Sequence, residues 1–491
     1  MLLLNKYVGK VVSCGALVLY CLNLPLEIHF LPENVFLLGM MPSPEEATVW
    51  TIVHFLDTVR KIIMEFNLPG QILALIADLQ ASKKISGFGS ITANYFCTYC
   101  LCHKKNIEDL NYTSWVHRVA ATVREQAQRW HDAITITEKN GLFLTTGVRW
   151  TPMYDIPYWN PVQYMILGFM HNILEGHHLR ELWGIGRKKE QKNKKVLKSK
   201  AEESEQEESG QGESKQEQEE GSSELTDAST EEETSDFEKF SEQGSTSSIR
   251  DQISDMDIES EDEDEELTPK AVPEFEPEEN EGEEEGPPIN VKNAFKFKDE
   301  QLTAIRLCIS KVMLPTWVEK PPRNLGEPKH GKLKAHQYLV LFTVILPLVL
   351  PELWHNGDAN EKKMLECFCD LLASTNIMAA YSTSNAEADK YMFHFVKYQK
   401  AIKELHPGHP SRPNHHYAMH NSDQLKFWGP LSTLSEFPGE RLNGELGDIP
   451  TNNHFSDMEL TMLRQYGRKA KLSIFSTVTT QTEKISCKLN K

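Results

Sequence analysis

The sequence predicts an α/β fold in the N-terminal part and a mostly helical C-terminal region, with a long disordered insert between them. Strand-like and helix-like segments alternate before residue 187, whereas residues 187–290 are low in complexity and nearly free of aromatic side chains. Helical patterns resume near Val291 and continue to about Lys471. We therefore expect domains at 1–186 and 291–471, a linker at 187–290 and a frayed polar tail at 472–491.

In the N-terminal part, residues from Val11 to Pro25 are rich in Val, Leu and Tyr and predict two short strands or one bent strand, interrupted at Gly15. Ser43 is a plausible N-cap for an amphipathic helix whose apolar positions continue to Ile63. The apolar run from Gln71 to Leu79 is short enough for a strand buried on both faces, with Asp78 near its end. An acid there suggests a site, but Asp78 is equally well explained as the cap of a following helix.

Charge is concentrated in the insert. Residues 201–290 contain 35 acidic and four basic side chains, so the rest of the chain is net +12 although the whole chain is −19. The preceding run, Arg187 to Lys200, holds eight of the basic residues, and it fits either a nuclear-import signal or a solvated linker. The remaining folded parts are near +5, a balance that permits binding to phosphate backbones without demonstrating it. We predict a nuclear protein.

Within the C-terminal region, Leu339 to Leu353 is strongly apolar but short for a membrane span, and Pro347 interrupts it. A buried, proline-kinked helix is the better interpretation. We predict no membrane association.

The strongest local motif is a cysteine-rich turn, Cys97-Thr98-Tyr99-Cys100-Leu101-Cys102-His103. C-x-x-C spacing lets two thiolates bind one tetrahedral Zn²⁺, which needs two further nitrogen or sulfur ligands. Cys102 and His103 are immediate candidates, but neighbouring side chains diverge, so we expect at least one ligand from far along the chain. We predict a structural zinc site, with ordinary buried cysteines as the alternative.

Two further clusters contain histidine. His171, in Met170-His171-Asn172, fits a core histidine, a site residue or the distant zinc ligand. Near the C-terminus, His415, His416 and His420 are spaced for a metal site or for a hydrogen-bonded helical face. Glu440 and Arg441 fit either a surface ion pair or an acid held near a reacting phosphate.

Taken in order, these clusters resemble the transposases of CACTA (En/Spm-like) DNA transposons of the fungal type. The resemblance extends from about Gly9 to Arg468 and rests on the ordered combination of short segments rather than on any single one. The principal segments are Cys21-Leu22-Asn23-Leu24-Pro25, Ala77-Asp78-Leu79, the cysteine turn, Gly147-Val148-Arg149-Trp150, Met170-His171-Asn172, Pro413-Asn414-His415-His416 and Glu440-Arg441-Leu442-Asn443-Gly444.

The resemblance implies an RNase H-like core with a zinc-binding insertion, acting on DNA by phosphoryl transfer. Such DDE/D enzymes use carboxylates to hold two Mg²⁺ or Mn²⁺ ions that clamp the attacking and leaving oxygens. Asp78 matches the second catalytic aspartate of the family, and Glu440 is the match for the third acid. For zinc, the family pattern supports Cys97 and Cys100, closed by His171, with Cys102 a further candidate.

The sequence also departs from the family pattern. The family's first aspartate lies just upstream of the segment matching Asn5 to Lys10, so we expect the core to be incomplete. Gly168 stands where the family usually has an aspartate, and His336 replaces another common acid. The expectation is therefore an inactive or very weakly active transposase-derived protein whose ancestral partner is DNA at transposon ends, and which forms a homo-oligomer in one interpretation. The alternative is a non-enzymatic zinc module that binds nucleic acid or protein.

Overall fold

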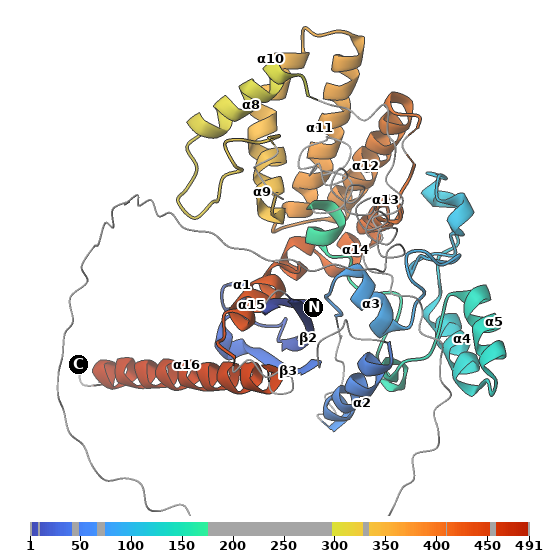
Figure 1. The fold of residues 1–491 in the computed structure, drawn as a ribbon, viewed down its shortest axis with the longest axis vertical. Helices are drawn as coiled ribbons and strands as arrows, with labels where there is room; N and C mark the ends of the chain where they lie inside the picture. Colours follow the sequence, from blue (N-terminus) through green and yellow to red (C-terminus); the bar gives the residue numbers. More distant parts are fainter. Residues whose placement is uncertain are drawn as a thin grey trace, which may run out of the picture. The chain divides into compact units, whose positions relative to one another are not determined.

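The structure is a computed structural model that describes residues 2–7, 10–41, 49–65, 74–174, 297–327, 333–408, 410–451 and 458–489. The linker predicted at 187–290 and the Ser43 helix cap lie outside these residues. The described part is mostly helical and contains one small sheet (Figure 1).

The sheet has three antiparallel strands in the order β1-β2-β3: β1 (Leu2–Tyr7), β2 (Lys10–Tyr20) and β3 (Val35–Met41). The strand predicted from Val11 is a single strand that ends at Tyr20, and its pairing with β3 is irregular between Leu17 and Val18. Between β2 and β3 lie a short helix, α1 (Leu26–His29), and a 3-10 turn, η1 (Pro32–Asn34).

Helix α2 (Val49–Glu65) follows β3 and agrees with the amphipathic pattern of the sequence. Ile52, Leu56 and Val59 recur every three to four residues and are buried, in one hydrophobic cluster with Ile156 and Trp159. The segment Ile156-Pro157-Tyr158-Trp159 is therefore part of the hydrophobic core.

The buried strand predicted at Gln71–Leu79 is not formed by the described residues 74–78. Leu75 makes only an isolated parallel bridge with Met165, and residues 74–78 are partly exposed. Asp78 instead precedes helix α3 (Leu79–Ser86), and its Oδ1 accepts a hydrogen bond from the Ala81 amide at 2.8 Å. Helix capping, one of the two interpretations of Asp78, is thus confirmed.

The segment from α3 to residue 174 consists of short helices and turns. Gly87, in the left-handed conformation (φ 76°), ends α3. The remaining elements are η2 (Lys104–Asn106), η3 (Tyr112–Ser114), α4 (Ala120–Asp132), α5 (Ile136–Thr146), η4 (Pro152–Asp155) and a π-helical turn, η5 (Met170–Leu174).

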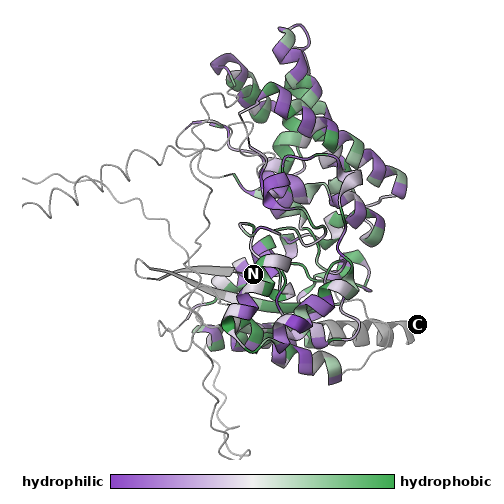
Figure 2. Ribbon diagram, turned by 90° about the vertical axis from the view of Figure 1, so that its right-hand side faces the viewer, coloured by the Kyte–Doolittle hydropathy of each residue, from purple (hydrophilic) through white to green (hydrophobic). Residues whose placement is uncertain are grey.

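The C-terminal region is helical, as the sequence predicts. In Figure 2 its helices carry hydrophilic and hydrophobic residues along the same ribbon, as amphipathic helices do. The elements are α8 (Asp299–Lys311), α9 (Ala335–Val340), the π-turn η6 (Leu341–Ile345), α10 (Leu346–Trp354), α11 (Ala359–Ala379), α12 (Asn385–Leu405), α13 (Pro413–Ala418), α14 (Asn421–Trp428), η7 (Leu431–Leu434), α15 (Phe437–Gly447) and α16 (Met458–Leu489).

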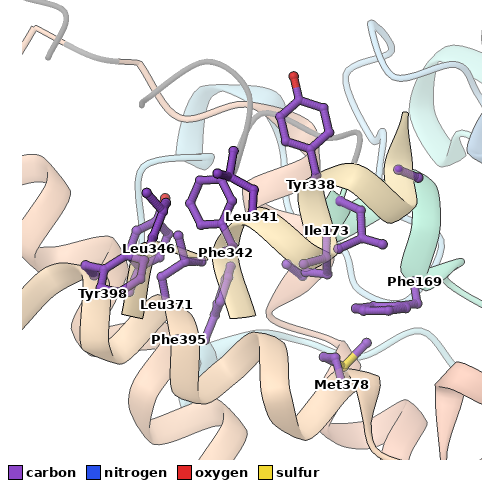
Figure 3. Close-up of a cluster of buried hydrophobic side chains, with 14 of the residues drawn as sticks. Phe169, Ile173, Tyr338, Leu341, Phe342, Leu346, Leu371, Met378, Phe395 and Tyr398 are labelled. Atoms are coloured by element: carbon purple, nitrogen blue, oxygen red, sulfur yellow. The ribbon is translucent and has the colours of Figure 1, made fainter. Parts of the chain in front are cut away.

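The largest hydrophobic cluster joins these helices to η5. Phe169 and Ile173 lie among buried side chains of α9, η6, α11 and α12 (Figure 3). The apolar run predicted as a kinked helix is split by the π-turn η6, and Pro347 lies in the first turn of α10. Among the described residues, Ala335–Trp354 is the one helical run that meets length and composition criteria for a membrane span, and 50% of the tested stretch is buried inside the fold.

Helices α15 and α16 lie against the sheet. Met458, Met462 and Tyr466 are one helical turn apart and are buried with Leu446 and Met40. Helix α16 continues to Leu489, through the segment expected to be a frayed tail. These contacts attach the C-terminal helices to the N-terminal strands.

Candidate metal centre

The C-x-x-C turn is held in a fixed conformation by backbone contacts. Cys97 and Cys100 are fully buried, and Cys100 forms an antiparallel bridge with His117. The Arg118 amide donates to the Tyr99 carbonyl at 2.8 Å, and the Tyr99 amide donates to Cys97 Sγ at 3.4 Å. The two sulfurs therefore belong to a compact turn closed by the chain that returns at residues 116–118.

Two buried basic side chains, Lys83 and Arg118, donate hydrogen bonds to backbone carbonyls at and near this turn. Lys83 Nζ donates to the carbonyls of Gly89, at 2.6 Å, and Phe96. Arg118 Nε donates to the Cys97 carbonyl at 2.9 Å. Burial lowers the pKa of Lys83 to about 7.

The other half of the centre comes from more than 300 residues later. His416 lies in the short helix α13 and His420 directly precedes α14, so one helical turn places both imidazoles on the same side. Both are buried. His416 stacks on Trp115, with ring centroids 4.2 Å apart, and this contact fixes its orientation.

The four side chains have the geometry of a tetrahedral site. Cys100 Sγ lies 3.2 Å from His416 Nε2, Cys97 Sγ lies 3.4 Å from His420 Nε2, and the two Nε2 atoms are 3.4 Å apart. All four ligand atoms lie within 4.8 Å of one another. Zn–S bonds of about 2.3 Å and Zn–N bonds of about 2.05 Å at tetrahedral angles require S···N edges of about 3.5 Å and N···N edges of about 3.3 Å. The donor atoms thus fit one Zn²⁺ ion.

Electrostatics in the centre favour a negative charge on the cysteine pair. Burial raises the pKa of the Cys97 thiol, but the hydrogen bond with Cys100 and the charges of His420 and His416 outweigh it, so the pKa is well below its usual value. The pKa of Cys100 is raised by sharing that hydrogen bond and by burial. Although burial lowers the pKa of His416, the Cys97 thiolate raises it to about 9. The cluster therefore favours negative charge on the cysteine pair, which is the form that binds a cation.

The structure brings Cys97 and Cys100 together in a group that could hold a metal ion, but the other two members of this group are not the ligands expected from the sequence. Cys102 is partly exposed, lies beside His416 and directs its Sγ to the His103 carbonyl at 3.5 Å. His171 lies elsewhere, on η5, with its Nε2 3.9 Å from Glu440 Oε1.

A polar network links η5 to the helices that carry the two histidines. Asn172 Nδ2 donates to the Asn414 carbonyl at 3.4 Å, and Asn421 Nδ2 donates to Asn172 Oδ1 at 3.3 Å. Asn421 Nδ2 also lies 2.9 Å from the Tyr391 hydroxyl oxygen. In the Met-His-Asn segment, Asn172 thus supports the helices of the metal centre, whereas His171 contacts Glu440.

That second group is acidic. Glu440 contacts His171, and Glu436, one helical turn earlier, accepts the Met170 amide at 3.2 Å through Oε2. The charge of Asp78 also acts on Glu436. Glu440, one of the two expected catalytic acids, and Glu436, which the sequence did not single out, therefore both contact η5, whereas Asp78 acts on Glu436 only through its charge.

Comparison of the chain with models of protein families, with curated proteins and with solved structures gives no match. The metal centre and the acidic group therefore rest on the geometry described above.

Proposed function

We propose that this chain is a transposase-derived protein of the CACTA (En/Spm-like) type whose fold is stabilised by one zinc ion and whose ancestral substrate is DNA. The observation that carries the proposal is the pairing of the cysteine turn with His416 and His420. This pairing connects the segment that follows Asp78 to the helices that lead into α15 and Glu440. A zinc ion here would contribute folding energy directly, because a closed four-ligand site leaves no position for substrate.

The order of elements supports an RNase H-like ancestry. An antiparallel β1-β2-β3 sheet is followed by α2, and then by a segment that makes a parallel bridge at Leu75 and leads to Asp78. Glu440 of α15 contacts His171 of η5, and the charge of Asp78 acts on Glu436, the residue that precedes α15. Carboxylates so placed would hold Mg²⁺ or Mn²⁺, which would supply charge stabilisation for phosphoryl transfer on DNA.

Two features favour weak or absent catalysis. Gly168 provides no carboxylate next to η5, and Asp78 uses one oxygen to cap α3. These features also favour the second candidate, a non-enzymatic zinc module that binds nucleic acid. The proposal also places the protein in the nucleus, with DNA as its partner, and includes formation of a homo-oligomer.

A strand-transfer assay on DNA carrying the terminal repeats of the parent element separates the two candidates. Metal-dependent cleavage or joining that is abolished by Asp78→Ala supports the enzyme. DNA binding without turnover, unchanged by Asp78→Ala, supports the module. Failure to bind or process DNA at all contradicts both.

A further inference from the structure

Glu436 is a buried acid that forms no ion pair with the described residues. The residue is only 6% exposed, and its Oε1 has no hydrogen-bond partner in the described part of the chain. Its other oxygen accepts the Met170 amide. Burial raises the pKa of this carboxyl group to about 7. Retaining an ionisable group with an unpaired oxygen in the interior is costly, so its position calls for a physical explanation.

The carboxyl group of Glu436 fills the space beside Gly168. A Cβ atom built on Gly168 would overlap this carboxyl group, with Oε1 as the nearest atom. Any side chain at position 168 would displace Glu436. The glycine and the glutamate are therefore complementary, and the space next to the Gly168 backbone is occupied by the carboxyl group of Glu436, the residue that precedes α15.

Two other acids, Asp78 and Glu440, belong to the same acidic group. Asp78 is close enough to raise the pKa of Glu436, whereas His171 lowers it. Glu440 follows Glu436 by one turn of α15 and contacts His171. Asp78 uses Oδ1 to cap α3.

We propose that Glu436 is a ligand for a divalent cation at this acidic group, so that the residue preceding α15 supplies the carboxylate that Gly168 lacks. Mg²⁺ and Mn²⁺ prefer oxygen ligands, and a cation would neutralise the buried charge and bond the orphaned oxygen. Unlike the four ligand atoms of the metal centre, the carboxyl oxygens of Asp78, Glu436 and Glu440 do not all lie within 4.8 Å of one another. Cation binding therefore requires these carboxyl groups to move closer together. The inference rests on the proposed function, because the acids concerned are those assigned to phosphoryl transfer.

Cation binding can be measured without DNA. The zinc-loaded full chain is titrated with Mn²⁺ alone, and bound Mn²⁺ is followed by electron paramagnetic resonance and calorimetry. Glu436→Gln keeps the shape of the side chain but removes the charge, and we expect affinity to fall at least about tenfold. Glu445→Gln, on the same helix but paired with Lys469 at 2.8 Å, should leave affinity unchanged.

A relocation variant tests the complementarity itself. Gly168→Asp combined with Glu436→Ser moves the carboxylate to the other side of the same space, and we expect it to recover Mn²⁺ binding that Glu436→Ser alone loses. Retained zinc and an unchanged circular dichroism spectrum identify the variants that fold. Mn²⁺ affinity that is the same in wild type and Glu436→Gln, or undetectable in folded wild type, overturns the inference. Failure of the proposed function is read separately, from DNA binding and strand transfer.

Discussion

The buried carboxyl group of Glu436 makes the stability of the protein depend on pH in a defined direction. Its pKa rises from 4.5 to about 7 on folding, mainly because of burial. Between these values the folded protein keeps a proton that the unfolded chain releases, so stability is fully present below about pH 4.5, falls as pH rises and levels off above about pH 7. Because Glu436→Gln mimics the protonated side chain, it removes this loss.

The magnitude follows from the shift. About 2.5 pKa units correspond to about 3 kcal/mol, most of which falls between about pH 5 and about pH 8. Exposure of 6% leaves little solvent to reduce it. The relative stability of Glu436→Gln should therefore increase by on the order of 2–3 kcal/mol across that range.

Urea unfolding of both zinc-loaded proteins, in buffers free of Mg²⁺ and Mn²⁺, measures the difference at each pH. Comparing variants removes the pH dependence of groups that they share. Glu445→Gln is the matched control and should follow wild type. A difference between wild type and Glu436→Gln that stays constant from about pH 5 to about pH 8 would refute the argument, because it would mean that Glu436 is ionised in the folded state throughout.

Two further substitutions probe the metal centre and the core beside it. Cys97→Ser should lose zinc and reduce the free energy of unfolding by about 3 kcal/mol, which is the contribution of a ligand present at a hundredfold its dissociation constant. Cys102→Ser should retain both the zinc and the wild-type stability. Metal analysis and thermal melting measure these two properties. Arg124 donates to three backbone carbonyls in residues 154–159, so Arg124→Met should destabilise the protein by on the order of 2–3 kcal/mol. The exposed Arg129→Met on the same helix should change little, and equal urea midpoints for the two variants would contradict the role of Arg124.

The metal centre was half predictable because half of it is local. C-x-x-C spacing places two sulfurs together through a short turn, whatever the rest of the fold. His416 and His420 were noticed for their helical spacing, but joining them to a turn over 300 residues away depends on packing across the whole core. His171 was assigned from the family pattern, and the structure directs it to Glu440 instead. A search for two histidines at helical spacing to complete a C-x-x-C turn would have found the pair.

The acidic group shows the same limit. The sequence left Asp78 open between a helix cap and a site residue, and the structure confirms the cap while also placing it near Glu436. Gly168 was recognised as a departure, but nothing local to it indicates that a glutamate 268 positions later fills the space. Of the strand predicted before Asp78, the described residues form only one bridge, at Leu75. Apolar composition alone does not distinguish a strand from a partly exposed extended segment.

A zinc ion bound jointly by the cysteine turn and by His416 and His420 is tested by zinc X-ray absorption on the purified full-length protein with measured metal content. We expect one zinc per chain with two sulfur ligands at about 2.3 Å and two imidazole nitrogens at about 2.0–2.1 Å. His416→Ala and His420→Ala should each remove one nitrogen ligand or the zinc ion itself, whereas His171→Ala should leave the spectrum unchanged. A folded protein that binds no zinc when zinc is supplied, or a spectrum with three sulfur ligands, would contradict this coordination.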